Sequence, residues 1–214
     1  MFYLASPSSN YSYSSPSSSI IHKLDVKRAA GLASVVYYYF DFLDAVKQTR
    51  QGLLSSLLLQ LASESDQCYE ILSRLHMTHT PRKPADASLM HCLEDMLKQH
   101  RQATYIIIDG IDECPNTSCF PTPRGKVLEF LEGLIDLQLP HLRICIASRP
   151  EADIRNTLEP LTSLRVSLHD ESGQRKDILD FVTKVVRTDP QMRKWTEEDK
   201  LLVIRILSEK SEGM

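Results

Sequence analysis

The sequence predicts an α/β fold in which a parallel sheet is covered by helices on both faces, as a three-layer sandwich. Several short runs are almost continuously apolar and rich in β-branched or aromatic residues, which is typical of buried parallel strands. Segments with helical spacing of apolar residues alternate with these runs. The 214 residues are enough for one domain with a sizeable core. The predicted strands are Ser34–Phe42, Thr104–Ile108, Leu142–Ala147 and a weaker fourth, Leu164–Leu168.

Helical periodicity accounts for most of the remaining chain. The clearest example has leucines at helical spacing in residues 54–61, and we expect this face in the core. A proline-containing break at residues 80–84 separates two further helices. After Pro150, Glu151 and Asp153 suit the first turn of another helix. The longer predicted helices are Gly52–Leu61, Asp66–Leu75, Ser88–His100, Val127–Leu137, Asp177–Val186 and Glu197–Glu212.

The composition argues against several classes of function. The net charge is −3 and the isoelectric point about 6.2, whereas a dedicated nucleic-acid binder normally has a basic excess. No apolar run approaches the ~18 residues of a membrane span, so we expect no membrane partner. The five cysteines do not form the pattern of a disulfide framework, which indicates a reducing, cytoplasmic setting. Glycine is scarce, and none precedes Gly31.

The start of the chain differs in composition from the rest. Residues 1–19 hold nine serines, two prolines and three tyrosines, and the first Lys, Arg, Asp or Glu is Lys23. Such low complexity usually indicates disorder, and only Phe2–Ala5 has the character of a strand. We therefore divide the chain into a serine-rich start at 1–19, an α/β core at 20–170 and a helical tail at 171–214.

An acidic cluster follows the second strand. Asp109, Asp112 and Glu113 come directly after four apolar residues, with Gly110 between them. Strand C-termini meet at one edge of a parallel sheet, which is where α/β sites form. Asp109 is therefore a candidate ligand for Mg²⁺, and Glu113 could orient or deprotonate a water. The alternative is an acidic turn that only terminates the strand.

An arginine follows the third strand. Ser148, Arg149 and Pro150 come directly after Ala147. At the same edge of the sheet as the acidic cluster, the Arg149 guanidinium could bind a phosphate oxygen. The alternative is an ion pair between Arg149 and the acidic cluster.

Four segments resemble a known family: YYYFDF at Tyr37–Phe42 with Asp44, GLLSSLLLQL at Gly52–Leu61, YIIIDGIDEC at Tyr105–Cys114 and RICIASRPEADI at Arg143–Ile154. They resemble a NACHT-type nucleotide-binding domain, a P-loop NTPase, and are closest to the nephrocystin-like version of fungal STAND signalling proteins. The resemblance covers the chain from about Ser18 onward.

The resemblance implies a role for each candidate residue. Asp109, in the Walker B motif, would hold Mg²⁺ through water, and Asp112 and Glu113 would serve hydrolysis. Ser148 and Arg149 would face the nucleotide, ATP or GTP, with Arg149 as the sensor of the γ-phosphate. The Walker B and sensor strands would be neighbours, and the P-loop strand would lie beyond the sensor strand. Residues 171–214 would begin a helical C-terminal arm, truncated in this chain.

The sequence departs from the family at the P-loop, whose form is G-x-x-x-x-G-K-[ST]. Gly125-Lys126 is the only Gly-Lys pair, and it follows the Walker B strand. Ser17–Leu24 nevertheless resembles the helix that follows a P-loop, and Phe2–Ala5 lies at the right distance to be its strand. We therefore predict that Phe2–Ala5 occupies the P-loop strand position, in a fold that is degenerate at its N-terminus.

The absence of the P-loop lysine and amides can be converted into an expected decrease in nucleotide affinity. Hydrogen bonds to charged groups contribute roughly 1.5–3 kcal/mol each, so the total loss is on the order of 5 kcal/mol. That loss corresponds to about three to four decades in affinity. We expect weak or absent nucleotide binding and no hydrolysis.

Three functions remain open from the sequence. The first is a nucleotide-dependent signalling module with the roles given above. The second is a non-catalytic remnant, or a fragment of a larger protein, that acts through contacts with other protein domains or by self-association. The third is an unrelated α/β enzyme whose acidic cluster binds Mg²⁺ with another phosphorylated substrate.

Overall fold

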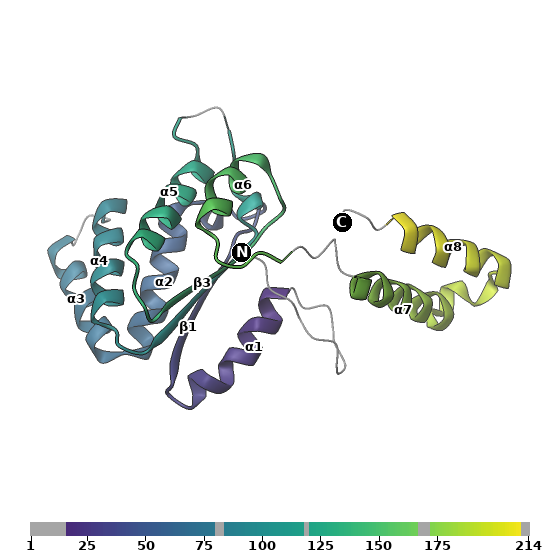
Figure 1. The fold of residues 1–214 in the computed structure, drawn as a ribbon, viewed down its shortest axis with the longest axis horizontal. Coiled ribbons are helices and arrows are strands. Elements are labelled where there is room, and N and C mark those ends of the chain that lie inside the picture. Colours follow the sequence, from purple (N-terminus) through teal and green to yellow (C-terminus); the bar gives the residue numbers. More distant parts are fainter. Residues whose placement is uncertain (1–15, 80–83, 118–119, 167–171, 211–214) are drawn as a thin grey trace. The chain divides into compact units, whose positions relative to one another are not determined.

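The computed structural model of the chain describes residues 16–79, 84–117, 120–166 and 172–210 (Figure 1). The chain forms two compact units, Met1–Val166 and Ser167–Met214, which are described separately below. The larger unit contains the sheet and every candidate site residue.

In its described residues, the larger unit is organised by a parallel sheet of three strands. Its strands are β1 (Ala33–Tyr39), β2 (Ala103–Asp109) and β3 (Leu142–Ala147), in the spatial order β1-β2-β3. The register aligns Tyr39 with Asp109 and Asp109 with Ala147, so the three strands end together. The predicted α/β class, the three stronger strands and the neighbouring positions of β2 and β3 are confirmed.

The prediction of a fourth strand is wrong over the residues that can be compared. Leu164–Val166 form no strand, and Leu164 is about half exposed. An apolar pattern of only five residues is a weak signal, and in the described chain no neighbouring strand pairs with this segment. The last two residues of the prediction, and the whole of Phe2–Ala5, lie outside the described residues.

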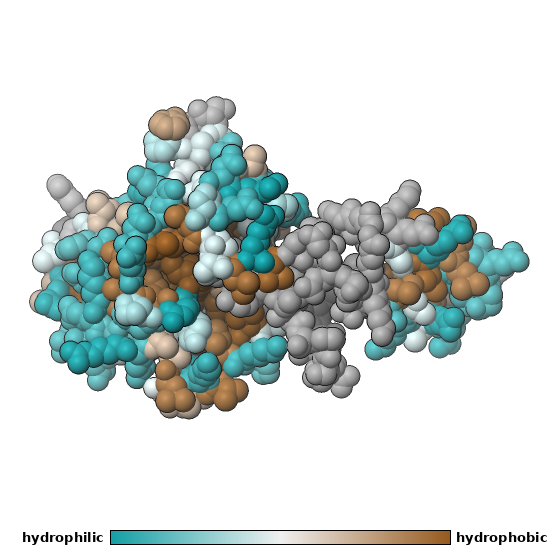
Figure 2. All heavy atoms as spheres, in the orientation of Figure 1, coloured by the Kyte–Doolittle hydropathy of each residue, from teal (hydrophilic) through white to brown (hydrophobic). Residues whose placement is uncertain are grey.

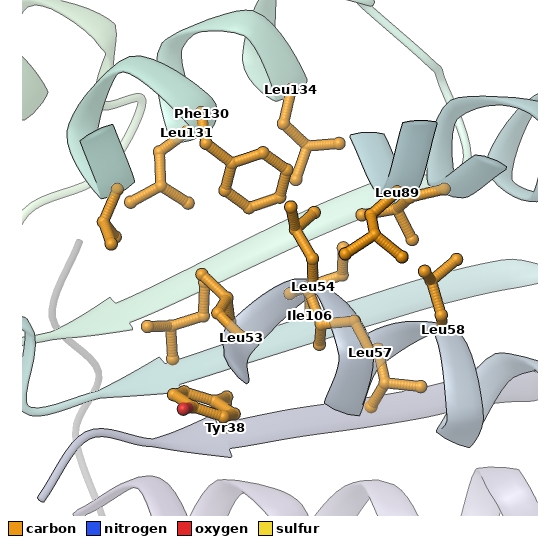
Figure 3. Packing of buried hydrophobic residues seen from close by; sticks show 14 of the residues in the cluster. Tyr38, Leu53, Leu54, Leu57, Leu58, Leu89, Ile106, Phe130, Leu131 and Leu134 are labelled. Atoms are coloured by element: carbon orange, nitrogen blue, oxygen red, sulfur yellow. The ribbon is translucent and has the colours of Figure 1, made fainter. Parts of the chain in front are cut away.

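Five helices cover one face of the sheet. The helix α2 (Arg50–Glu64) lies against the strands, and its N-cap Thr49 accepts a hydrogen bond from the Gly52 amide. All its leucines except the exposed Leu59 are fully buried, and they meet Tyr38 and Ile106 of the sheet (Figure 3). The other helices of this layer are α3 (Asp66–His79), α4 (Asp86–Gln99), α5 (Pro123–Asp136) and α6 (Ala152–Leu158).

Two boundaries differ from the prediction for identifiable reasons. The helix α5 begins at Pro123, four residues before the predicted Val127, because Thr122 caps it and proline suits its first position. The strand β1 ends at Tyr39, before the predicted Phe42. The Asp41 carboxylate accepts a hydrogen bond from the Leu43 amide, and this local bond turns the chain.

On the opposite face, one helix packs against the sheet in the part of the chain that the structure describes. The helix α1 (Pro16–Ala29) packs Ile20, Ile21 and Leu24 against Val35 of β1 and its neighbours in β2 and β3. It includes the predicted helix at residues 17–24. The described part of the larger unit is therefore a three-layer sandwich with α1 on one side of the sheet and α2–α6 on the other (Figure 1).

The smaller unit is a pair of helices. The helices α7 (Ser172–Thr188) and α8 (Glu197–Lys210) are joined by the short helix η4 (Pro190–Lys194) and pack against each other. Val186 and Ile204 are buried between them. Apolar side chains are also visible on the surface of this pair in Figure 2. In the described parts of both units, no helix combines the length and apolar character needed to cross a membrane.

Candidate functional site

The acidic loop lies at the carboxyl edge of the sheet, as predicted. Asp109 is the last residue of β2, and its carbonyl accepts a hydrogen bond of 2.9 Å from the Phe40 amide. The Gly110 amide then donates to the Ala147 carbonyl at 2.9 Å. Gly110 has φ 74°, in the left-handed region that glycine adopts without strain. The chain therefore leaves the sheet in a defined turn that continues into the short helix η2 (Ile111–Glu113).

The structure brings Asp112, Ser148 and Arg149 together. The Asp112 carboxylate accepts hydrogen bonds from the Ser148 hydroxyl at 3.0 Å and from the Arg149 amide at 3.1 Å. Its second oxygen lies 3.6 Å from the Arg149 Nε. This is the ion pair considered as the alternative for Arg149. The Arg149 side chain is nevertheless 83% exposed, so it is also available to an anion in solution.

The Glu113 side chain points toward β1, whereas Asp112 contacts the segment after β3 on the other side of β2. The Glu113 Oε2 accepts a hydrogen bond of 3.1 Å from the Phe42 amide, just beyond β1. Its side chain lies over Gly110, where an added Cβ would be 3.5 Å from the Glu113 carboxyl carbon. Asp112 and Glu113 thus point to different strands, and N–H groups of the chain itself offset their charges. Mutual repulsion in the acidic cluster therefore does not require a bound cation.

Asp109 differs from the other two carboxylates. No residue that the structure describes donates a hydrogen bond to its side chain. In the same part of the chain, no group of three or more His, Cys, Asp or Glu side chains is arranged to hold a metal ion. Mg²⁺ usually keeps several waters and takes one or two carboxylates together with substrate phosphates. Asp109 alone fits that mode of binding, but the site offers no protein cage for Mg²⁺ without phosphate.

Arg124 is a central residue of the site that the sequence did not reveal. It is 4% exposed, although it lies in the first turn of α5. Its Nε donates to the Cys114 carbonyl at 2.9 Å and its Nη2 to the Asp112 carbonyl at 2.6 Å. Its Nη1 pairs with Glu151 and with Asp153 at the start of α6. The sequence offered one indication of this role, which is the position of Arg124 near the start of a helix. A cation is unfavourable near a helix N-terminus unless an acidic partner holds it there.

Cys114 closes the acidic loop on the side of β1. Its thiol donates to the Gln48 carbonyl at 3.0 Å, and burial raises its pKa to about 11. A thiol with so high a pKa stays protonated at neutral pH and is a poor nucleophile. Like the other three cysteines in the described residues, it is free.

Comparison with known proteins assigns the family. The model of the family described as Nephrocystin 3, N-terminal matches residues 14–149. The match covers more than half of the chain and includes α1, all three strands and the loop that ends at Arg149. No curated protein and no solved structure matches the chain. The chain belongs to the nephrocystin 3 N-terminal family.

Proposed function

We propose that this chain is a nucleotide-binding module of the NACHT signalling type that binds Mg-ATP or Mg-GTP weakly and does not hydrolyse it. The supporting observation is the arrangement at the carboxyl edge of β2 and β3. Asp109 there has a carboxylate with no donor in the described chain, and the exposed Arg149 guanidinium follows the adjacent strand. A carboxylate and a guanidinium at one strand edge are suited to a metal-bound phosphate.

Each residue has a separate role in this proposal. Asp109 would hold a water of the Mg²⁺ shell, and Arg149 and Ser148 would face the phosphates. Bound Mg²⁺ would neutralise phosphate charge together with the Arg149 guanidinium. Asp112 orients Arg149 through its contact with the Arg149 amide. Glu113 must release the Phe42 amide before it can activate a water. This requirement, together with the lack of a P-loop motif in the sequence, is the reason to propose binding without turnover.

The proposal is tested by thermal unfolding of the full chain with Mg-ATP or Mg-GTP. At saturation of about 100 times the dissociation constant, binding stabilises the folded state by about 2.7 kcal/mol. We expect a rise in melting temperature only at millimolar nucleotide, and its loss in the Asp109→Ala and Arg149→Ala variants. Asp136→Ala, at the far end of α5, is the matched control and should retain the shift. An equal shift in all four proteins would contradict the proposed site.

A second candidate function is protein interaction without nucleotide. The observation in its favour is a mostly exposed apolar segment beside the site, Phe42, Leu43 and Val46. Both Asp112 and Glu113 are also satisfied by the chain's own N–H groups. This candidate predicts no thermal shift with either nucleotide, together with self-association or partner binding that Leu43→Ser weakens. Sedimentation velocity across a concentration series measures the self-association.

A further inference from the structure

We propose that Arg124 is a positioning residue that couples the acidic loop after β2 to the segment after β3, and thereby sets the contact between Asp112 and Arg149. The inference deepens the proposed function and rests on it for its nucleotide readout only. Arg124 is the one Lys, Arg, Asp or Glu that is buried among the described residues. Burial of a charge is costly unless the charge is paired and hydrogen-bonded, so its surroundings are informative.

The first half of the coupling concerns the acidic loop. The guanidinium donates hydrogen bonds to the carbonyls of Asp112 and Cys114, which are the residues on either side of Glu113. It therefore fixes the backbone of the turn that carries both candidate hydrolytic carboxylates. The Arg124 amide adds a third bond, to the Pro115 carbonyl at 3.1 Å. Arg124 therefore holds the backbone of this turn, in addition to the hydrogen bonds that its carboxylates accept.

The second half concerns the segment that follows Arg149. Nη1 of Arg124 pairs with the Glu151 and Asp153 carboxylates, two and four residues beyond Arg149. Asp153 also accepts a hydrogen bond of 3.0 Å from the Asn116 side chain, so a second contact crosses between the same two loops. Because the guanidinium reaches both loops, any displacement of one relative to the other breaks contacts of Arg124. The distance between Asp112 and Arg149 therefore depends on Arg124.

The chemistry requires arginine at this position. A guanidinium is a planar fork of five donors and can meet two carbonyls and two carboxylates in different directions. A lysine ammonium keeps the positive charge but is a single point with a different donor geometry. Arg124→Lys therefore separates the positioning role from simple charge neutralisation.

The experiment is residue-resolved amide hydrogen exchange by NMR on the full chain. We expect Arg124→Lys to accelerate exchange of the Arg149 amide, which donates to Asp112, by about tenfold. Amides in the centre of α2 should be unchanged. Arg50→Lys is the matched control, because Arg50 also joins two carboxylates, Asp86 and Glu129, but bonds neither the acidic loop nor the segment after β3. It should leave the Arg149 amide unchanged.

A second variant decides the question where Arg124→Lys fails to fold. The combined change Glu151→Gln and Asp153→Asn keeps the shape of both side chains and removes the charges that hold Arg124 to α6. It should accelerate the Arg149 amide in the same way. Unchanged exchange at Arg149 in a folded variant of either kind overturns the proposal.

Nucleotide binding provides a readout that a purely structural role would not move. Arg124→Lys should weaken the apparent affinity for Mg-ATP several-fold, seen as a thermal shift that requires more nucleotide, whereas Arg50→Lys should leave it unchanged. An equal loss in the two variants would overturn the coupling to Arg149. If the wild-type chain shows no response to Mg-ATP, the proposed function fails, whereas the exchange experiment still decides the role of Arg124.

Discussion

The surroundings of the buried His100 make the stability of the fold depend on pH. His100 caps the C-terminus of α4 and is buried. Its Nε2 lies 2.8 Å from the Ser34 hydroxyl, and its Nδ1 faces the Cys68 thiol at 4.0 Å. Burial lowers the pKa of His100 below its usual value, and the nearby His141 acts in the same direction, whereas Glu64 opposes it. The folded protein therefore favours the neutral imidazole.

This environment predicts that the free energy of unfolding decreases as the pH falls below about 6.5, the ordinary pKa of histidine. In that range the unfolded chain binds a proton at position 100 that the folded chain resists, so acid favours unfolding. Urea unfolding at about pH 7.5 and about pH 5.5 measures the difference. His100→Gln should reduce the dependence on pH, whereas His91→Gln, at an exposed position, should retain it. The same dependence in His100→Gln as in the wild type would disprove the assignment.

At the scale of elements, the outer edge of β1 is closed by a side chain. In a parallel strand, the backbone N–H and C=O groups of alternate residues point to opposite sides. Those of Tyr37 point away from β2. The Gln60 Oε1 accepts from the Tyr37 amide at 3.0 Å, and its Nε2 donates to the Tyr37 carbonyl at 2.8 Å. The amide of Gln60, on α2, thus takes the place of a neighbouring strand. Edges closed in this way are protected against pairing with other chains.

Removal of this amide should destabilise the sheet. Gln60→Met keeps the length of the side chain but loses the two hydrogen bonds to Tyr37, together with those to Ser56, at a cost of about 1–2 kcal/mol. Gln67→Met on α3 is the matched control, since Gln67 is exposed and bonds only another side chain, and it should have little effect. Urea unfolding gives the free energies, and light scattering gives any aggregation through the opened edge. Equal stabilities of the two variants would show that the edge contact contributes nothing.

How well the sequence predicts a feature of this structure depends on how far apart along the chain the interacting residues lie. The helix α2 and the strand β2 are specified by their own apolar patterns, and both were predicted within a few residues. The position of Asp109 at the strand edge follows from the same local pattern. The orientation of Glu113 does not, because its donor is the Phe42 amide, 71 residues away in the sequence. Arg124 escaped prediction for the same reason, since its carboxylate partners are 27 and 29 residues distant.

At the scale of the whole molecule, the connections of the sheet leave one position for a further strand. Crossovers between parallel strands are right-handed in almost all proteins. The chain moves from β1 to β2 to β3 through helices on one face. Because α1 lies on the opposite face, a strand before α1 must reach β1 from the side of β3. The outer edge of β3 is therefore the expected place for Phe2–Ala5.

The edge of β3 is suited to receive such a strand. Thr104 donates to the His141 carbonyl and Gly110 to the Ala147 carbonyl, so the backbone groups of Ile144 and Ile146 face away from β2. No described residue bonds to them. A groove of about 430 Å³ follows this edge between α5 and α6 and has a largely apolar lining. Apolar side chains also gather in the middle of the larger unit on the face shown in Figure 2.

We therefore predict that Phe2–Ala5 pairs with β3. Amide exchange measured by NMR should show protected amides at Ile144 and Ile146 in the full chain. Leu4→Pro removes a backbone donor and fixes φ, so both amides should exchange about tenfold faster or more. Ser9→Pro, outside the predicted strand, should leave them protected.

If Ile144 and Ile146 exchange in the wild type as fast as unstructured amides, the edge is open and Phe2–Ala5 lies elsewhere. Protection that survives Leu4→Pro would instead assign the edge to another segment.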